Sequence, residues 1–120
     1  MSFRQHLQDV CQGVEGAVAC SLMGLDGIEV DRWVSGSLPD VGLQSFLVEY
    51  SGVLRTLRDA VEANHAGELS EMSVRTDRLL TVARVVSPDY FMVVALTPEG
   101  NYGKARYLLR ITAPKVRSEL

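Results

Sequence analysis

The spacing of apolar and polar residues changes several times along the chain, and each change marks the boundary of a predicted element. Apolar side chains first recur every three or four positions, which predicts an amphipathic helix near the start of the chain. Ser2 and Gln5 form a capping-box pattern at its beginning, and Gly13 and Gly16 end the run. The residues on the apolar stripe of this helix are Phe3, Leu7, Val10, Cys11 and Val14.

Two runs of strand-like sequence then flank an Asp-Gly pair. An apolar, small-residue run over about 17–25 precedes Asp26 and Gly27, and an alternating run follows to Val34. Asp-Gly between such runs predicts a β-hairpin. Alternation places Ile28, Val30 and Arg32 on one face of the second strand, and Glu29, Asp31 and Trp33 on the other. A largely polar face is typical of an edge or half-exposed strand.

A loop over 35–40 leads to the longest predicted element, a helix over about 41–65. Asp40 is placed to cap this helix, and Gly67 is placed to end it. The apolar residues of the helix have helical spacing but cover more than one face. They are Phe46, Leu47, Tyr50, Val53, Leu54, Leu57 and Val61.

Three more strands are predicted over 68–76, 79–86 and 90–97, separated by short polar turns. The third is an almost unbroken apolar run, which is typical of a central strand buried on both faces. The strand over 68–76 is expected at a sheet edge, where an unpaired strand is prone to association.

The last predicted helix runs from Tyr102 to about Thr112, where Pro114 is expected to stop it and leave a frayed polar tail over about 114–120. The element order is α-β-β-α-β-β-β-α. We therefore expect an α+β fold, in which helices cover both faces of a five-stranded antiparallel sheet. The length of 120 residues fits a single domain over 1–120.

Composition narrows the classes of function. Hydrophobic residues make up 47% of the chain, and the net charge of -3 comes without a basic run, which argues against nucleic-acid binding. No apolar stretch reaches the ~18 residues of a membrane span, and the polar amphipathic start does not resemble a secretory signal. These features predict a cytoplasmic protein without membrane insertion. Cys11 and Cys20 are expected to be free thiols, because a disulfide framework or zinc site needs more ligands.

No catalytic constellation is recognisable, so we expect neither an enzyme nor a cofactor or metal site. The glycines match no phosphate-binding loop, and no serine lies in a nucleophile elbow. His6 and His65 are expected to be solvated. Arg55 and Arg58 match no motif and receive no role. The broad apolar stripe of the long helix exceeds what one sheet face needs, which favours an interface with another protein.

In its element order, its Asp-Gly hairpin and its last two strands, about residues 2–113 of the chain resemble the Roadblock family. This family includes dynein light chains and small regulators of Ras-like GTPases. The hairpin "GAVACSLMGLDGIEVDRW" and the pair "LLTVARV…YFMVVAL" carry the resemblance together with the long helix. Among bacterial members, the short length resembles the MglB/MglC branch, and its MglC-like members most.

The resemblance implies a homodimer in which the third strand, over 68–76, pairs with its copy to give one continuous sheet and the long helices pack side by side. The dimer-interface residues it implies are Tyr50, Leu54, Leu57, Met72, Ser73 and Val74. It further implies a regulatory adaptor in bacterial polarity and motility that binds an MglB-like Roadblock protein. A response-regulator-type polarity protein is a further implied partner, the GTPase is affected indirectly, and recruitment to the cell poles is expected.

Two alternative functions remain open: a direct activator of a Ras-like GTPase, and a small ligand-binding sensory module. At the hairpin, Leu25, Asp26 and Ile28 are predicted to contact the partner protein. In the other interpretation, Leu25 and Ile28 fold back onto the core beneath the turn.

Overall fold

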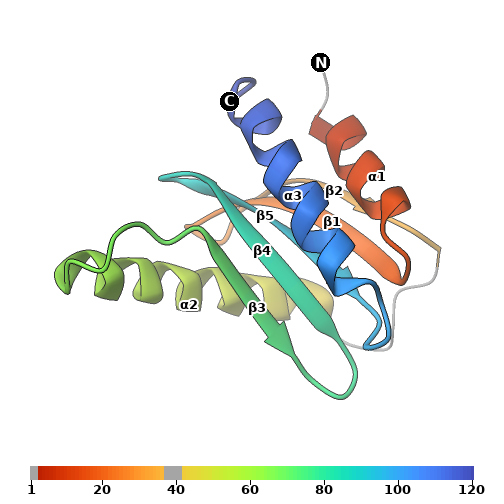
Figure 1. Cartoon of the computed structure of the whole chain (residues 1–120), viewed down its shortest axis with the longest axis horizontal. Helices are drawn as coiled ribbons and strands as arrows, with labels where there is room; N and C mark the ends of the chain where they lie inside the picture. Colours follow the sequence, from red (N-terminus) through yellow and green to blue (C-terminus); the bar gives the residue numbers. More distant parts are fainter. Residues whose placement is uncertain (1–2, 37–41) are drawn as a thin grey trace.

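The computed structural model describes residues 3–36 and 42–120, and Figure 1 shows the elements they form. One helix packs below the sheet in this view and two pack above it. In chain order, the elements are α1 (Phe3–Gly13), β1 (Ala17–Gly24), β2 (Glu29–Val34), α2 (Leu43–Ala63), β3 (Glu71–Arg75), β4 (Leu80–Ser87), β5 (Tyr90–Leu96) and α3 (Tyr102–Arg117).

The predicted element order and fold class are confirmed. All strand pairs are antiparallel, and the strand order across the sheet is β2-β1-β5-β4-β3. β5 is the central strand, and residues 91–96 are all buried because the strand has a neighbour on each side and helices over both faces. Ser2 and Asp40, which were predicted to cap helices, lie outside the residues that the structure describes.

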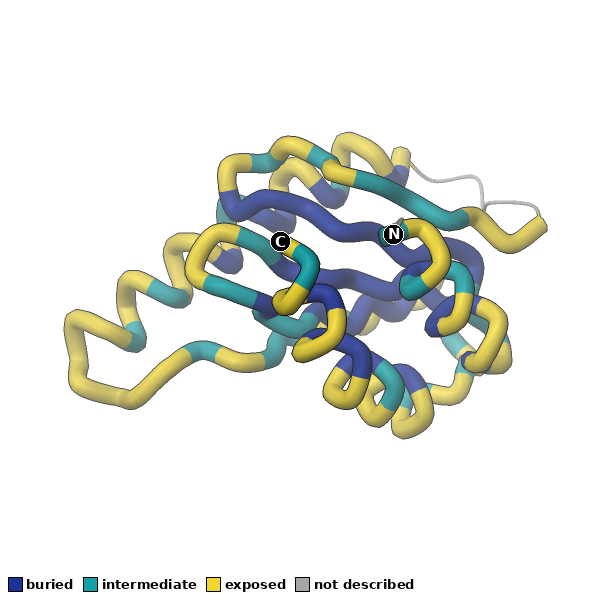
Figure 2. The backbone as a smooth tube through the Cα atoms, turned by 90° about the horizontal axis from the view of Figure 1, so that it is seen from above, coloured by how far each residue is buried: buried dark blue, intermediate teal, exposed yellow. Residues whose placement is uncertain are grey.

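The core has two layers, one on each side of the sheet. The first contains Leu7 of α1, Leu109 of α3 and Val94 of β5, and the second contains Leu47 and Leu54 of α2. Figure 2 shows the same arrangement, with buried runs along the inner strands and exposed turns on the outer sides of the helices. Since α2 covers its sheet face alone, its flanks have no neighbouring helix within the described chain.

β2 and β3 are the edge strands, as predicted, but one predicted face of β2 is wrong. A register shift between Leu22 and Met23 interrupts the pairing of β1 with β2. Glu29 therefore lies on the side of Arg32, with which it forms an ion pair of 2.9 Å, while Asp31 faces α1. A β-bulge inserts one extra residue and breaks simple alternation, so a period-2 interpretation misplaces Glu29.

The predicted ends of both long helices are also corrected. α2 ends at Ala63, before the predicted limit at residue 65, and His65 has a left-handed φ of 54°. The prediction that Pro114 stops α3 is wrong, because the helix continues to Arg117. Val116 is fully buried in the layer formed with α1, so packing offsets the hydrogen bond that proline cannot make. His6 of α1, which was predicted to be solvated, is instead half-buried and contacts Glu119 just beyond α3.

Candidate protein-interaction site

The hairpin tip, residues 24–28, is a tight and internally bonded turn. The Gly24 N–H donates to the Ile28 carbonyl at 2.8 Å, and the Gly27 N–H donates to the Gly24 carbonyl at 3.0 Å. The Asp26 carboxylate accepts the Ile28 N–H at 3.1 Å. Gly27 has a φ of 90°, a conformation that glycine adopts without the steric cost of a Cβ. The tip is therefore held in one shape before any partner binds.

Two arginines of α2 fasten this tip to the rest of the molecule. The Arg55 guanidinium donates to the Leu25 carbonyl. Arg58 donates to the Pro88 carbonyl at 2.9 Å in the neighbouring turn, whose Asp89 carbonyl accepts the Leu25 N–H at 2.9 Å. The sequence analysis missed both arginines, because their acceptors are backbone carbonyls thirty positions away and no local pattern records such a contact.

The two aliphatic residues of the tip have different environments. Leu25 is only 4% exposed and belongs to the core layer beneath α2, so the interpretation that it packs inward is correct for this residue. Ile28 is 67% exposed and points away from that layer, and Asp26 is also exposed. Of the three residues predicted to contact a partner, Asp26 and Ile28 are therefore accessible in the isolated chain, and Leu25 is not.

The turn that carries Ile28 has an apolar neighbour on α2. A Cβ added at Gly27 would lie 3.6 Å from Val48 Cγ1, so the turn rests directly on this part of the helix. Val48 is itself exposed. We call Asp26, Ile28 and Val48 the hairpin-tip surface. On the side of Arg55 and Arg58, a hollow of about 400 Å³ adjoins the same turn.

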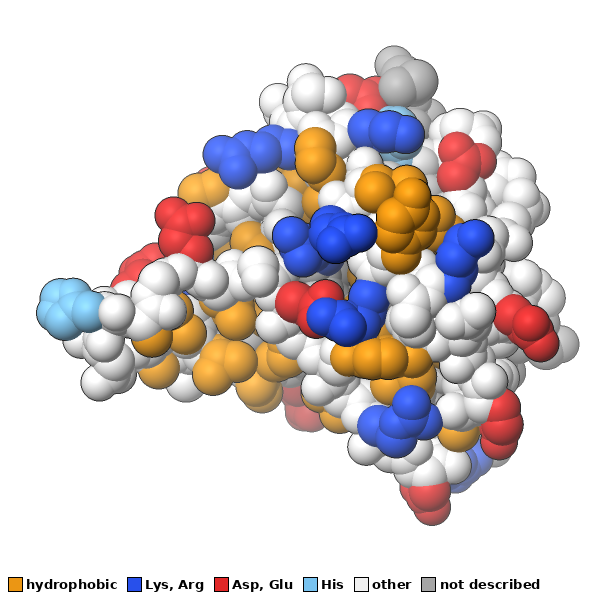
Figure 3. Space-filling view, in the orientation of Figure 1, with side chains coloured by type: hydrophobic (Ala, Val, Ile, Leu, Met, Phe, Trp, Pro, Cys, Tyr) orange, Lys and Arg blue, Asp and Glu red, His pale blue; other side chains and the backbone are white. Residues whose placement is uncertain are grey.

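A second apolar surface lies on the opposite flank of α2 and continues onto β3. Val53 and Leu57 are exposed on the helix, and Met72 and Val74 are half-buried on the same side of β3. We call these four residues the α2–β3 surface. Figure 3 shows hydrophobic side chains gathered over this part of the molecule. A shallow depression of about 580 Å³ runs along α2 beside Val53 and Leu57.

The residues predicted for a dimer interface are only partly accessible. Tyr50 and Leu54 are buried against the sheet, and the Tyr50 hydroxyl donates to the Met72 carbonyl at 3.1 Å. Burial raises the pKa of Tyr50 to about 12. Leu57 is exposed, and so is Ser73 on the opposite face of β3 from Met72. Val53 was missed, although its i, i+4 spacing to Leu57 marks the same flank.

The described residues contain no arrangement that indicates reaction chemistry. Within them, no three His, Cys, Asp or Glu side chains are grouped to hold a metal ion. Cys11 and Cys20 are free and buried, and burial raises the pKa of the Cys11 thiol to about 11. No helix among these residues is both long and apolar enough to cross a membrane.

A sheet of this strand order, with α2 on one face and α1 and α3 on the other, is the Roadblock fold, and the chain belongs to the Roadblock family. It is similar to MglC from Myxococcus xanthus, with 53% sequence identity over the full length of both chains and a TM-score of 0.73. The sequence-based resemblance to MglC-like members is thus confirmed.

More distant solved structures share the fold. A Roadblock/LC7 domain from Streptomyces avermitilis is 18% identical, with a TM-score of 0.80 over 96% of this chain and 94% of that one. The gliding protein MglB from Thermus thermophilus is 12% identical, with a TM-score of 0.82 over 98% of this chain and 89% of that one. A scan against protein-family models and a search of curated proteins found no match.

Proposed function

We propose that this protein is a non-enzymatic regulatory adaptor of a Ras-like small GTPase system in bacterial cell polarity and motility. It binds a paralogous, MglB-like Roadblock protein and affects the GTPase indirectly. The observation that carries the proposal is the full-length similarity to MglC, combined with an exposed aliphatic residue on a rigid hairpin tip. The proposed location is the cytoplasm, with recruitment to cell poles, and a response-regulator-type polarity protein is a further proposed partner.

The hairpin-tip surface is the proposed contact for the MglB-like partner. Its turn is already ordered by three hydrogen bonds, so binding costs little conformational entropy. Burying an exposed aliphatic side chain contributes on the order of 1.5–3 kcal/mol. Ile28 and Val48 supply this apolar area, and Asp26 shapes the turn and presents a charge at its rim.

The α2–β3 surface is the proposed homodimer contact. A two-fold axis beside β3 would pair this strand with its copy and bring the two α2 helices together. Such pairing removes an open sheet edge and covers Val53 and Leu57 at the same time. The proposed function therefore uses two separate surfaces, one for self-association and one for the paralogue.

The partner contact is tested by titrating an MglB-like protein from the same organism with the Ile28→Ala variant. We expect affinity to fall roughly tenfold, which corresponds to about 1.4 kcal/mol. Val30→Ala is the matched control, because Val30 is another exposed aliphatic residue of β2 outside the tip. Equal affinity of wild type and Ile28→Ala would contradict the proposed contact.

A direct activator of a Ras-like GTPase is the second candidate, because the Roadblock family includes small regulators of these GTPases and MglB shares the fold. Single-turnover GTP hydrolysis by the cognate Ras-like GTPase separates the two functions. We expect the hydrolysis rate with this protein alone to stay within about twofold of the rate of the GTPase by itself. The arginines nearest the hairpin tip, Arg55 and Arg58, both donate to carbonyls of their own chain and so do not offer a free guanidinium to the GTPase. A tenfold acceleration by this protein alone would make the activator function the correct one.

A further inference from the structure

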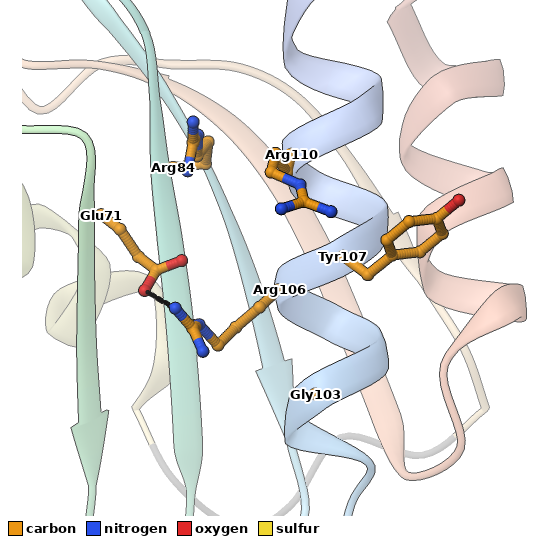
Figure 4. Close-up of a pocket in the computed structure, with 6 residues that line it drawn as sticks. All are labelled: Glu71, Arg84, Gly103, Arg106, Tyr107 and Arg110. Atoms are coloured by element: carbon orange, nitrogen blue, oxygen red, sulfur yellow. Dashed lines mark hydrogen bonds and ion pairs between the residues drawn. The ribbon is translucent and has the colours of Figure 1, made fainter.

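A groove lies between α3 and the strands β3 and β4, on the face of the sheet opposite α2. It encloses about 260 Å³, and Figure 4 shows the side chains around it. Arg84 rises from β4, Arg106 and Arg110 project from α3, and Glu71 faces them from β3. The lining residues are Glu71, Arg84, Gly103, Arg106, Tyr107 and Arg110. We call this feature the arginine groove.

The charge of the groove departs from that of the whole chain. α3 carries five basic residues and no acidic one within Tyr102–Arg117, while the chain as a whole has a net charge of -3. Arg84 adds a further cation from the sheet face that α3 covers only in part. Figure 3 shows basic side chains grouped around one acidic side chain in front of α3 and β4. Three arginines and one carboxylate thus line one concave place on a protein of net negative charge.

Most of this positive charge is not neutralised by the chain. Arg106 is held by Glu71, with an Nε to Oε2 distance of 2.9 Å. Among the described residues, Arg84 and Arg110 have no carboxylate partner. Arg110 lies 5.6 Å from the centre of the Tyr107 ring, which orients its guanidinium and leaves its N–H groups available. The groove therefore presents two guanidinium groups without a carboxylate partner in the described part of the chain, and the Tyr107 ring orients one of them, Arg110.

An apolar strip borders the arginines. Tyr107 and Ile111 are one turn apart on α3, and both are exposed. Arginines that serve only to keep a surface soluble need no exposed apolar side chains beside them, so the apolar strip indicates that part of a ligand packs there. A ligand that satisfies the whole site therefore carries negative charge and an apolar group together.

We propose that the arginine groove binds an acidic segment of a partner protein, in which carboxylate side chains alternate with apolar ones. Glu71 contacts Arg106 through Nε and Nη2 only, so this guanidinium keeps further N–H groups for a ligand. Arg106 and Arg110 are four residues apart, about 6 Å along the helix axis. Carboxylates at i and i+4 of a helix, or at i and i+2 of a strand, have nearly the same spacing. Guanidinium groups bind carboxylates through paired hydrogen bonds. This surface goes beyond the adaptor function proposed above and does not depend on it.

Other anionic partners fit the site less well. A membrane surface is flat, whereas these arginines line a hollow that also contains Glu71. A nucleic acid needs a longer basic track than one groove of this size. The row of guanidinium groups, with apolar side chains at its margin, matches a short peptide most closely.

The test is fluorescence anisotropy of the full-length protein with one defined peptide. The probe is fluorescein-Glu-Leu-Ala-Ala-Glu-Leu-Ala-Ala-Glu-amide, and its control has Gln at each Glu position. We expect binding of the Glu peptide that weakens between about 0.05 M and 0.3 M salt, and no binding of the Gln peptide. Absence of saturable binding of the Glu peptide at low salt would overturn the proposal.

Variants locate the binding. Arg84→Gln combined with Arg110→Gln is expected to lower affinity about tenfold, whereas Glu71→Gln is expected to raise it about threefold by freeing Arg106. Lys115→Gln combined with Arg117→Gln removes equal charge from α3 outside the groove and serves as the matched control. Equal losses in the two double variants would overturn the proposal. Groove-dependent binding to phosphatidylglycerol vesicles without peptide binding would also overturn it, in favour of a membrane.

Discussion

Among single residues, the hairpin shows how two aliphatic side chains on either side of one turn receive different roles. Leu25 precedes the turn and packs under α2, while Ile28 follows the turn and remains in solvent. The turn reverses the chain within three residues, so the side chains on its two sides face different environments. Only the second residue is available to another protein.

Leu25→Ala should lower the free energy of unfolding by about 2–5 kcal/mol, because it leaves a cavity in a packed layer. Ile28→Ala should change it by no more than about 0.5 kcal/mol, since the side chain is already solvated. Urea unfolding of both variants measures the difference. Similar losses in the two variants would place both side chains in the core.

Arg55 is predicted to act as a fastener of the hairpin tip. Arg55→Met keeps the aliphatic stem but removes the donor to the Leu25 carbonyl, which should cost about 1–2 kcal/mol. Hydrogen exchange of the tip amides should speed up, while exchange in β5 changes little. Arg117→Met, an exposed substitution on α3, is the control and should leave exchange at the tip unchanged.

At the scale of elements, α3 shows that packing can outweigh a local stop signal. Pro114 removes one helical hydrogen bond, but the turn that follows carries Val116 into the core. The chain then reaches Glu119, which contacts His6 of α1. The end of α3 is therefore part of the layer that covers the sheet.

Val116→Ala tests this role of the last turn. Removing two buried carbon atoms should lower the free energy of unfolding by about 2 kcal/mol. Lys115→Ala, an exposed change at the neighbouring position, should cost no more than about 0.5 kcal/mol. If both variants unfold at the temperature of the wild type, the last turn contributes no stability.

The contact between Arg4 of α1 and Asp31 of β2 contributes a pH-dependent part of the free energy of unfolding. Burial tends to raise the pKa of Asp31, but hydrogen bonds from Arg4 and from the Arg32 N–H outweigh it, and the net pKa is lowered. Because the pKa of Asp31 is lower in the folded state than in the unfolded state, the ionised carboxylate stabilises the fold at pH values above the ordinary pKa of Asp, near 4. This contribution disappears as the pH falls through the folded-state pKa.

Asp31→Asn should therefore destabilise the protein at pH 7 and not at the lowest pH at which it remains folded. Because Arg4 is largely exposed, the expected loss at pH 7 is less than about 1 kcal/mol. Urea unfolding of wild type and variant over a pH series measures the difference. A difference that grows as the pH falls would contradict the assigned sign.

At the scale of the whole molecule, unequal coverage of the sheet leaves one side incomplete. α1 and α3 share one face, whereas α2 lies alone on the other, beside the open edge of β3. The α2–β3 surface gathers exposed aliphatic groups at that place. A second copy would supply both the missing strand and the missing helix neighbour.

Leu57→Glu should convert a dimer into a folded monomer, because it places a charge in the proposed two-fold contact. Ile111→Glu is a close control, since Ile111 is 39% exposed and Leu57 is 40% exposed. Sedimentation velocity of wild type and both variants reads out the mass. A wild type that sediments as a monomer at tens of micromolar would contradict the proposed dimer.

Several features of the fold that depend on neighbouring positions in the chain were predicted correctly. The Asp26-Gly27 turn, the central position of β5 and the edge position of β3 all follow from period and turn chemistry, which are local properties. The arginine groove was not foreseen, because Arg84, Arg106 and Glu71 are far apart in the sequence. Arg55 and Arg58 were overlooked for the same reason.

Periodicity and turn residues act over a few positions, so they were enough to predict the order and type of the elements and the class of the sheet, and they carried much of the resemblance to the Roadblock family. The burial of Leu25, the exposure of Ile28 and the continuation of α3 past Pro114 became clear only from the packing of the folded chain. The same holds for the place of Tyr50 and Leu54 in the core. Burial depends on which surfaces the folded chain brings together. A helical stripe records that several residues are apolar, but the packing of α2 on the sheet selects which of them remain outside.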